Sequence, residues 1–143
     1  MIVVSDTAPL NYLLLIGEAE LLPKLFGRVI VPPAVLDEMI HPAAPEIVRA
    51  WAANPPAWIE SMRPAAPIFA KELKADLLLI DERRAKQVAI ANHVKVTGTL
   101  GVLEFAAQRG LINLATAIDA LCQTTFRRPD YLIDEILKRN RPD

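Results

Sequence analysis

Three apolar segments of this sequence are each followed by acidic residues, namely Asp6, then Asp37 and Glu38, then Asp81 and Glu82. Carboxylates that gather at one place repel one another, and they stay ionised together only when a cation neutralises them. Their hard oxygen atoms favour Mg²⁺ or Mn²⁺. Such an ion can activate a water molecule and stabilise charge on a phosphoryl group. If these acids meet in space, the chemistry that they predict is phosphodiester hydrolysis.

The acids can meet only if the apolar segments are neighbouring strands. Their near-continuous apolar character is typical of parallel strands buried on both faces. We expect strands at 2–4, 28–31, 77–80 and 95–97, with a short edge strand at 58–62 in the least regular stretch. Proline, glycine and capping signals predict helices at 10–16, 18–26, 32–40, 45–53, 68–74, 82–92, 99–108, 114–123 and 130–140. This alternation predicts an α/β domain with a central parallel sheet, whose strands all end at one edge.

The acids that end strands also have structural interpretations. Asp6 could cap the helix that follows, but Thr7 can cap it instead, so we favour a metal ligand at Asp6. Asp81 could cap the next helix, but the clear strand before it favours a ligand there too.

The acids on helices are less specific. Asp37 or Glu38 would equally suit the solvent face of an amphipathic helix. Glu82 fits a first-turn acid slightly better than a ligand. Thr97 and Thr99 are expected to be turn and cap residues, with contact to the site as the alternative.

Composition narrows the class of protein. The chain has 143 residues, 52% of them apolar, and a net charge of -1, which predicts one folded domain over 1–143. No apolar run approaches the ~20 residues that span a membrane, and the start lacks the basic region of a signal peptide. The single cysteine, Cys122, cannot form an internal disulfide, which favours the cytoplasm. Its apolar surroundings favour a buried structural thiol over a nucleophile.

Charge and motifs exclude several functions. A pI near 6.1 gives no overall attraction for nucleic acid, so binding would need local patches. The candidate patches are Arg83–Arg84 with Lys86, Arg127–Arg128, and Lys138–Arg139 with Arg141. Each patch alone is better explained as the solvent-exposed face of a helix. There is no glycine-rich phosphate loop, dinucleotide fingerprint or Gly-x-Ser-x-Gly motif. Ala8 stands where an aspartyl phosphatase would need its second acid.

Four blocks resemble the PIN-domain family, and most closely its toxin-like, VapC-related branch of uncharacterised prokaryotic proteins. They read VVSDTAPL at 3–10, VIVPPAV with the acid Glu38 at 29–38, ADLLLIDERRA at 75–85, and VTGTLGVL at 96–103. The blocks cover most of the chain in the family's order, which makes them more specific than any single motif.

The resemblance implies a three-layer α/β/α fold that binds Mg²⁺ or Mn²⁺ and cleaves single-stranded RNA. It also implies the toxin of a toxin–antitoxin pair, bound by an antitoxin protein and forming a homodimer, with no membrane association. Carried over residue by residue, it makes Asp6, Glu38 and Asp81 catalytic acids. The same three side chains would bind the metal, with Glu82 beside them.

One block of the branch is missing. Relatives have a Gly-Glu-x-Glu-Ala-Ile-like stretch before the 77–80 strand that supplies a central acid, whereas this chain has Ala65 and its neighbours there. Asp76 and Glu72 would lie at the wrong edge of the sheet, and Glu60 could serve only if the proline-rich segment folds back. The stretch is therefore lost, absent from this version of the sequence, or replaced by another acid.

The residues and the family resemblance leave three possible functions. The first is a metal-dependent ribonuclease. The second is a degenerate PIN-like module that binds RNA or protein without cleavage, as the missing acid would allow. The third is a structural dimerisation domain that uses the apolar helix 10–16, although the core can equally claim that helix.

Overall fold

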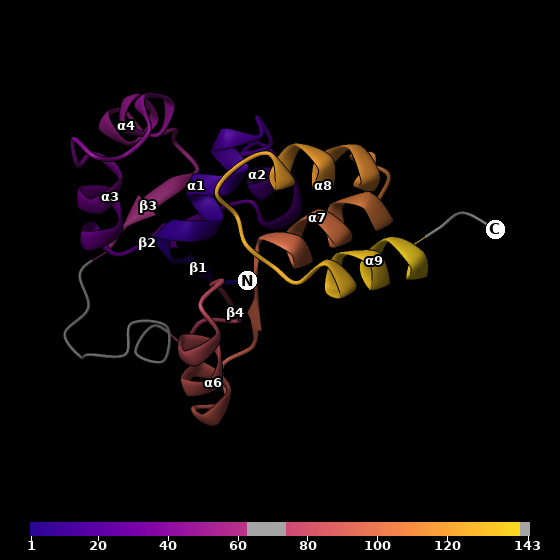
Figure 1. The fold of residues 1–143 in the computed structure, drawn as a ribbon. Helices are drawn as coiled ribbons and strands as arrows, with labels where there is room; N and C mark the ends of the chain where they lie inside the picture. The colour runs from indigo at the N-terminus through magenta and orange to yellow at the C-terminus, as the bar shows by residue number, and fades with distance from the viewer. Residues whose placement is uncertain (63–73, 141–143) are drawn as a thin grey trace.

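A computed structural model describes residues 1–62 and 74–140 of the chain (Figure 1). The strands are β1 (Val3–Ser5), β2 (Val29–Val31), β3 (Ile59–Ser61), β4 (Leu77–Leu79) and β5 (Val96–Thr97). The helices are α1 (Thr7–Leu15), α2 (Leu21–Phe26), α3 (Pro33–Met39), α4 (Glu46–Ala53), α6 (Arg83–Ala91), α7 (Thr99–Gln108), α8 (Leu114–Cys122) and α9 (Asp130–Arg139). Apart from the helix expected at 68–74, the predicted strands and helices occur in the predicted order, with ends shifted by no more than three residues.

The five strands form one parallel sheet in the order β3-β2-β1-β4-β5. Val4 of β1 lies opposite Ile30 of β2 and Leu78 of β4, and Leu79 lies opposite Thr97 of β5. The short strand β3 is at the edge of the sheet, as the sequence predicts. Because all strands run the same way, their carboxyl ends lie at one edge, which we call the carboxyl edge.

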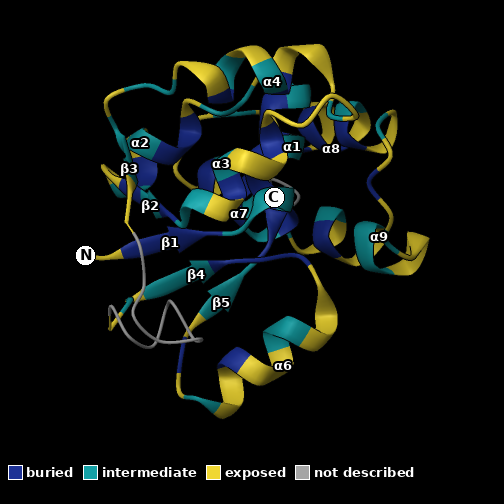
Figure 2. Cartoon of the chain, turned by 90° about the vertical axis from the view of Figure 1, so that its left-hand side faces the viewer, coloured by how far each residue is buried: buried dark blue, intermediate teal, exposed yellow. Residues whose placement is uncertain are grey.

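Helices cover both faces of this sheet, which confirms the three-layer α/β/α prediction. Figure 2 shows α1, α3, α4, α7 and α8 on one side of the sheet and α6 on the other. The main core lies under the first group, where Leu10, Leu13 and Leu103 are fully buried. A smaller cluster of Ala89 and Val94 lies between α6 and the opposite face.

The position of α1 bears on the dimerisation hypothesis. Leu10 and Leu13 have no exposed surface and Leu14 is 7% exposed, so the apolar face of this helix packs into the core. That face is therefore already covered within one copy of the chain.

Three local predictions need comment. Gly98 is the N-cap of α7 and Thr99 is its first residue, so the prediction that Thr99 caps this helix was wrong. Cys122 is exposed rather than buried, because at the end of α8 it is one residue, or ~100°, past the buried Leu121. Most of the helix expected at 68–74 lies outside the described residues, and Lys74 itself is in a turn.

The described residues contain no helix long and apolar enough to cross a membrane.

Candidate functional site

The strands bring the candidate acids to the carboxyl edge. Asp6 directly follows β1, and its backbone N–H donates to the carbonyl of Leu79 at 2.9 Å, which ties it to the end of β4. Asp81 comes two residues after β4. Glu38 is on α3, which leaves the same edge after β2, and Glu82 is the N-cap of α6.

The charges of the other acids affect the pKa of Asp6. Burial raises the pKa of Asp6 above its ordinary value, and the charges of Glu38, Asp81 and Glu82 raise it further, while the Thr7 backbone N–H opposes them. Asp6 is the N-cap residue of α1, but its side chain makes no capping hydrogen bond. Its half-buried carboxylate therefore lies near other acids and does not cap the helix through a side-chain hydrogen bond.

Glu38 and Glu82 are the exposed acids of the group. The Thr7 hydroxyl donates to Glu38 Oε2 at 2.5 Å, which links α3 to the first turn of α1. Glu82 Oε2 accepts from the Ala85 backbone N–H at 3.2 Å, so Glu82 is the N-cap of α6 rather than an acid of its first turn. Glu38 is thereby aimed at the Asp6 end of the edge, whereas Glu82 already has a structural role.

Asp81 is the buried acid, with 8% of its surface exposed. Its Oδ1 accepts from the Thr99 backbone N–H at 2.7 Å, and its Oδ2 accepts from the Thr99 hydroxyl at 2.6 Å. Thr99 is fully buried at the start of α7, so this helix end fixes the carboxylate. Gly98 makes the approach possible, because a Cβ there would lie 2.5 Å from Asp81 Oδ1.

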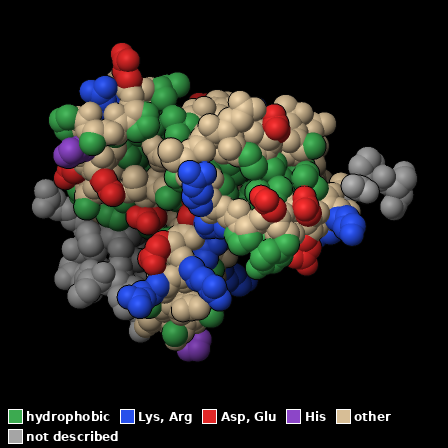
Figure 3. Space-filling view, in the orientation of Figure 1, with side chains coloured by type: hydrophobic (Ala, Val, Ile, Leu, Met, Phe, Trp, Pro, Cys, Tyr) green, Lys and Arg blue, Asp and Glu red, His purple; other side chains and the backbone are tan. Residues whose placement is uncertain are grey.

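Two basic side chains also lie at this edge, although the sequence indicates them only as members of basic surface patches. Arg128 Nη2 donates to the Asp81 backbone carbonyl at 2.7 Å and lies 3.7 Å from Asp81 Oδ1. A Cβ on Gly98 would lie 2.9 Å from Lys86 Nζ, so this ammonium lies against the same glycine. Figure 3 shows acidic and basic side chains next to one another between α3 and α6.

Helical spacing could have indicated Lys86, which lies four residues after Glu82 on α6 and so on the same face. Burial lowers the pKa of Lys86, and Arg128 lowers it further, whereas the charge of Asp81 raises it. The sequence indicates Arg128 only as part of a basic pair and does not place it at the edge, because it reaches the edge from the loop between α8 and α9.

The donor chemistry fits a hydrated hard cation rather than a metal held in a protein cage. Within residues 1–62 and 74–140, no three or more His, Cys, Asp or Glu side chains are grouped to hold one ion. Mg²⁺ does not need such a group, because it keeps several waters and commonly binds through one or two carboxylates plus a substrate phosphate. Asp6 with one neighbouring acid is enough for that mode of binding.

The other acids considered for the missing position are elsewhere. Asp76 is at the opposite edge, where its Oδ2 accepts from the Ile2 backbone N–H at 2.5 Å. Glu60 lies 3.5 Å from Arg28 and forms an exposed ion pair with it. Glu72 and Ala65 lie outside the described residues. No described acid replaces the central one of the resemblance.

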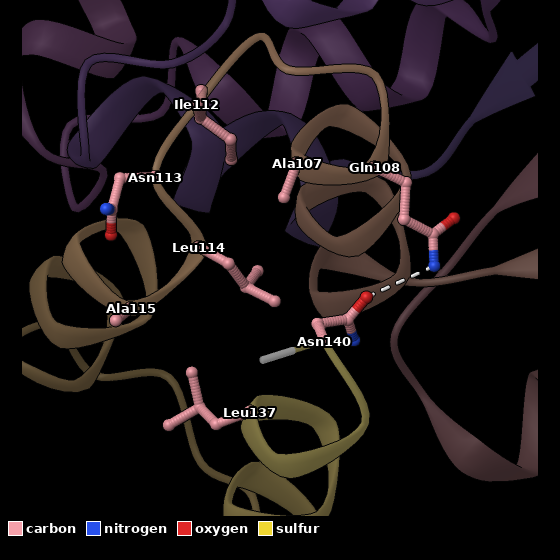
Figure 4. A pocket seen from close by; sticks show the side chains of 8 residues that line it. All are labelled: Ala107, Gln108, Ile112, Asn113, Leu114, Ala115, Leu137 and Asn140. Atoms are coloured by element: carbon pink, nitrogen blue, oxygen red, sulfur yellow. Dashed lines mark hydrogen bonds between the residues drawn. The ribbon is translucent and has the colours of Figure 1, made fainter. Parts of the chain in front are cut away.

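A cleft of about 510 Å³ lies away from this edge, between α7, α8 and α9 (Figure 4). Gln108 and Asn140 face each other at its side and share a hydrogen bond of 3.2 Å. None of the residues that line the cleft is acidic. The candidate site is therefore a separate feature of the carboxyl edge.

The fold is an α/β/α domain that carries a group of acids at the carboxyl edge of its parallel sheet. A family model described as a PIN domain matches residues 2–141, so the chain belongs to the PIN-domain family. PIN domains are generally nucleases that bind nucleic acid and use divalent metal ions. Searches of curated proteins and of solved structures find no significant match.

Proposed function

We propose that the protein is a metal-dependent endonuclease that cleaves single-stranded RNA at the carboxyl edge. One observation carries this proposal: Asp6, Glu38 and Asp81 lie at the carboxyl edge, where the Asp6 N–H is bonded to Leu79 of β4 and Glu38 is bonded to Thr7, the residue after Asp6. A group of acids that repel one another at a strand-end site is stabilised by a divalent cation. Membership of the PIN-domain family supports the same chemistry.

In this proposal Asp6 and one neighbouring acid, Glu38 or Asp81, contact Mg²⁺ or Mn²⁺ directly, and the other acids, Glu82 among them, lie beside the hydrated ion. When bound, the ion would supply an activated water and stabilise charge on the phosphoryl group. The protein's own contribution is to fix the acids before RNA arrives. Thr99 holds both oxygens of Asp81, and Thr7 holds Glu38.

A catalytically degenerate binding module is the second candidate, and the basic side chains favour it. Arg128 lies 3.7 Å from Asp81 Oδ1, and the described residues contain no group of three metal-ligating side chains. Positive charge beside Asp81 takes up part of the negative charge that would attract an ion. A protein of this kind would bind RNA or a partner without cutting.

The resemblance extends the proposal to a cytoplasmic toxin of a toxin–antitoxin pair. An antitoxin protein and a homodimer belong to this part of the proposal. It rests on the four sequence blocks and on the lone cysteine, which suits a reducing compartment. Growth arrest on expression of the wild-type chain is the expected sign of this role.

The nuclease proposal predicts that the purified protein cuts a mixed-sequence single-stranded RNA when Mn²⁺ or Mg²⁺ is added. Cleavage should stop in EDTA and return when the metal is restored, because the acids alone supply no activated water. Gel analysis of end-labelled RNA measures both rates. Intact RNA after incubation of the folded protein with metal would instead favour the degenerate module.

A further inference from the structure

Lys86 and Arg128 converge on the carboxyl edge from elements far apart in the sequence. Lys86 Nζ lies against Gly98 on one side, and Arg128 lies against the Asp81 carbonyl and carboxylate on the other. The Arg128 side chain is 26% exposed and is stacked on Phe126, with 4.9 Å between its guanidinium and the ring centre. Packing against the ring and the carbonyl holds the guanidinium in a fixed direction.

The two cations are not fully neutralised by their surroundings. Within the described residues, the Lys86 ammonium has neither a hydrogen bond nor a carboxylate oxygen within 4.0 Å, although the side chain is half buried. Arg128 donates one N–H to the Asp81 carbonyl and another to the Arg127 carbonyl at 2.8 Å. A guanidinium has five N–H donors, so others remain for a ligand.

RNA needs such positive charge at this place. The acids of the carboxyl edge repel a phosphodiester, and the chain's net charge of -1 gives no general attraction. Positioned cations beside the acids can hold one phosphate and direct the backbone over them. Guanidinium and ammonium groups bind phosphate through charge-assisted hydrogen bonds.

We propose that Lys86 and Arg128 form a phosphate anchor, which binds a backbone phosphate of single-stranded RNA beside Asp81. The inference rests on the proposed function, since it names how the substrate of the same site is held. The anchor positions RNA and takes no part in bond breaking. It acts before cleavage and without the metal.

Binding in EDTA separates the anchor from catalysis. Fluorescence anisotropy of a short mixed-sequence single-stranded RNA gives the affinity of the wild type and of Lys86→Gln and Arg128→Gln. Each variant should lose about fivefold in affinity at about 0.1 M salt, and its salt dependence should fall by about 0.7 in slope, as for one lost phosphate contact. Arg127→Gln, an exposed neighbour of Arg128, is the matched control and should bind as the wild type does.

Lys86→Gln is the decisive variant, because Arg128 also bonds to the Asp81 carbonyl and its loss could unfold the loop. Lys86→Arg keeps the charge and should restore both affinity and slope, which a purely structural role would not predict. Unchanged affinity and slope in folded Lys86→Gln would overturn the anchor, as would a wild-type protein that does not bind RNA in EDTA. Wild-type binding lost in Lys86→Gln, with no cleavage in metal, would keep the anchor and reject the nuclease.

Discussion

Replacing Asp6 by asparagine is expected to lower metal-dependent RNA cleavage on the order of a hundredfold or more, because the substitution removes a charged oxygen ligand. The backbone of Asp6 also serves the fold, since its N–H bonds to Leu79, but asparagine keeps that contact. The side chain makes no capping hydrogen bond that asparagine would lose. Activity should therefore fall while the fold is retained.

Stability should respond in the opposite direction to activity. Burial and the neighbouring acids raise the pKa of Asp6, so the folded state holds this proton to higher pH than the unfolded chain does. The contribution of Asp6 to stability is complete below its unfolded pKa and is lost as pH rises through the raised folded value. In metal-free buffer at neutral pH, Asp6→Asn should be at least as stable as the wild type, and the difference should vanish in acid.

Urea unfolding at several pH values and the RNA cleavage assay measure the two effects. Asp134→Asn is a suitable control, because Asp134 is an exposed acid on α9. It should change neither quantity. Cleavage at the wild-type rate by Asp6→Asn would remove Asp6 from the site.

Thr99→Val is expected to cost about 1.5–3 kcal/mol of unfolding free energy, the usual range for a hydrogen bond to a charged group. Valine matches the shape of threonine, but it leaves Oδ2 of the buried Asp81 without its donor at 2.6 Å. The carboxylate then keeps the bond from the Thr99 backbone N–H but is held less firmly at the carboxyl edge. RNA cleavage should therefore decrease together with stability.

Thr99→Ser tests whether the hydroxyl is the cause. Serine keeps the donor and loses only a methyl group, so it should retain most of the stability and activity. Chemical denaturation of the three proteins gives the comparison. A loss below about 0.5 kcal/mol in Thr99→Val would show that the buried contact contributes no more than a surface substitution does.

The layers of the fold could be predicted because the sequence of each main strand is clearly recognisable. The runs at 2–4 and 77–80 are apolar throughout, and in a parallel sheet such strands must end at one edge. From the sequence alone, that rule predicts that Asp6 and Asp81 lie at the same edge. The predicted helix ends were less accurate. Thr99 could cap its own helix, but its hydroxyl donates instead to the carboxylate of Asp81, which is distant in the sequence.

The basic half of the site could not be predicted in the same way. Arg128 lies 47 residues from Asp81 in the chain, and their contact depends on how the α8–α9 loop returns to the edge. A pair of arginines in a sequence is usually a solvated surface, and nothing local distinguishes Arg128 from Arg127. Only tertiary packing, which places one of them on Phe126 and Asp81, separates their roles.

The central claim is that the acids of the carboxyl edge bind a divalent metal ion. Titrating the isotope-labelled protein with Mn²⁺, and following the line broadening of its backbone amide signals, would locate the ion directly. We predict that the amides of Thr7, Glu82 and Thr99 broaden first and that Asp6→Asn removes the effect. Uniform broadening, or broadening centred on Asp76 at the opposite edge, would contradict the claim.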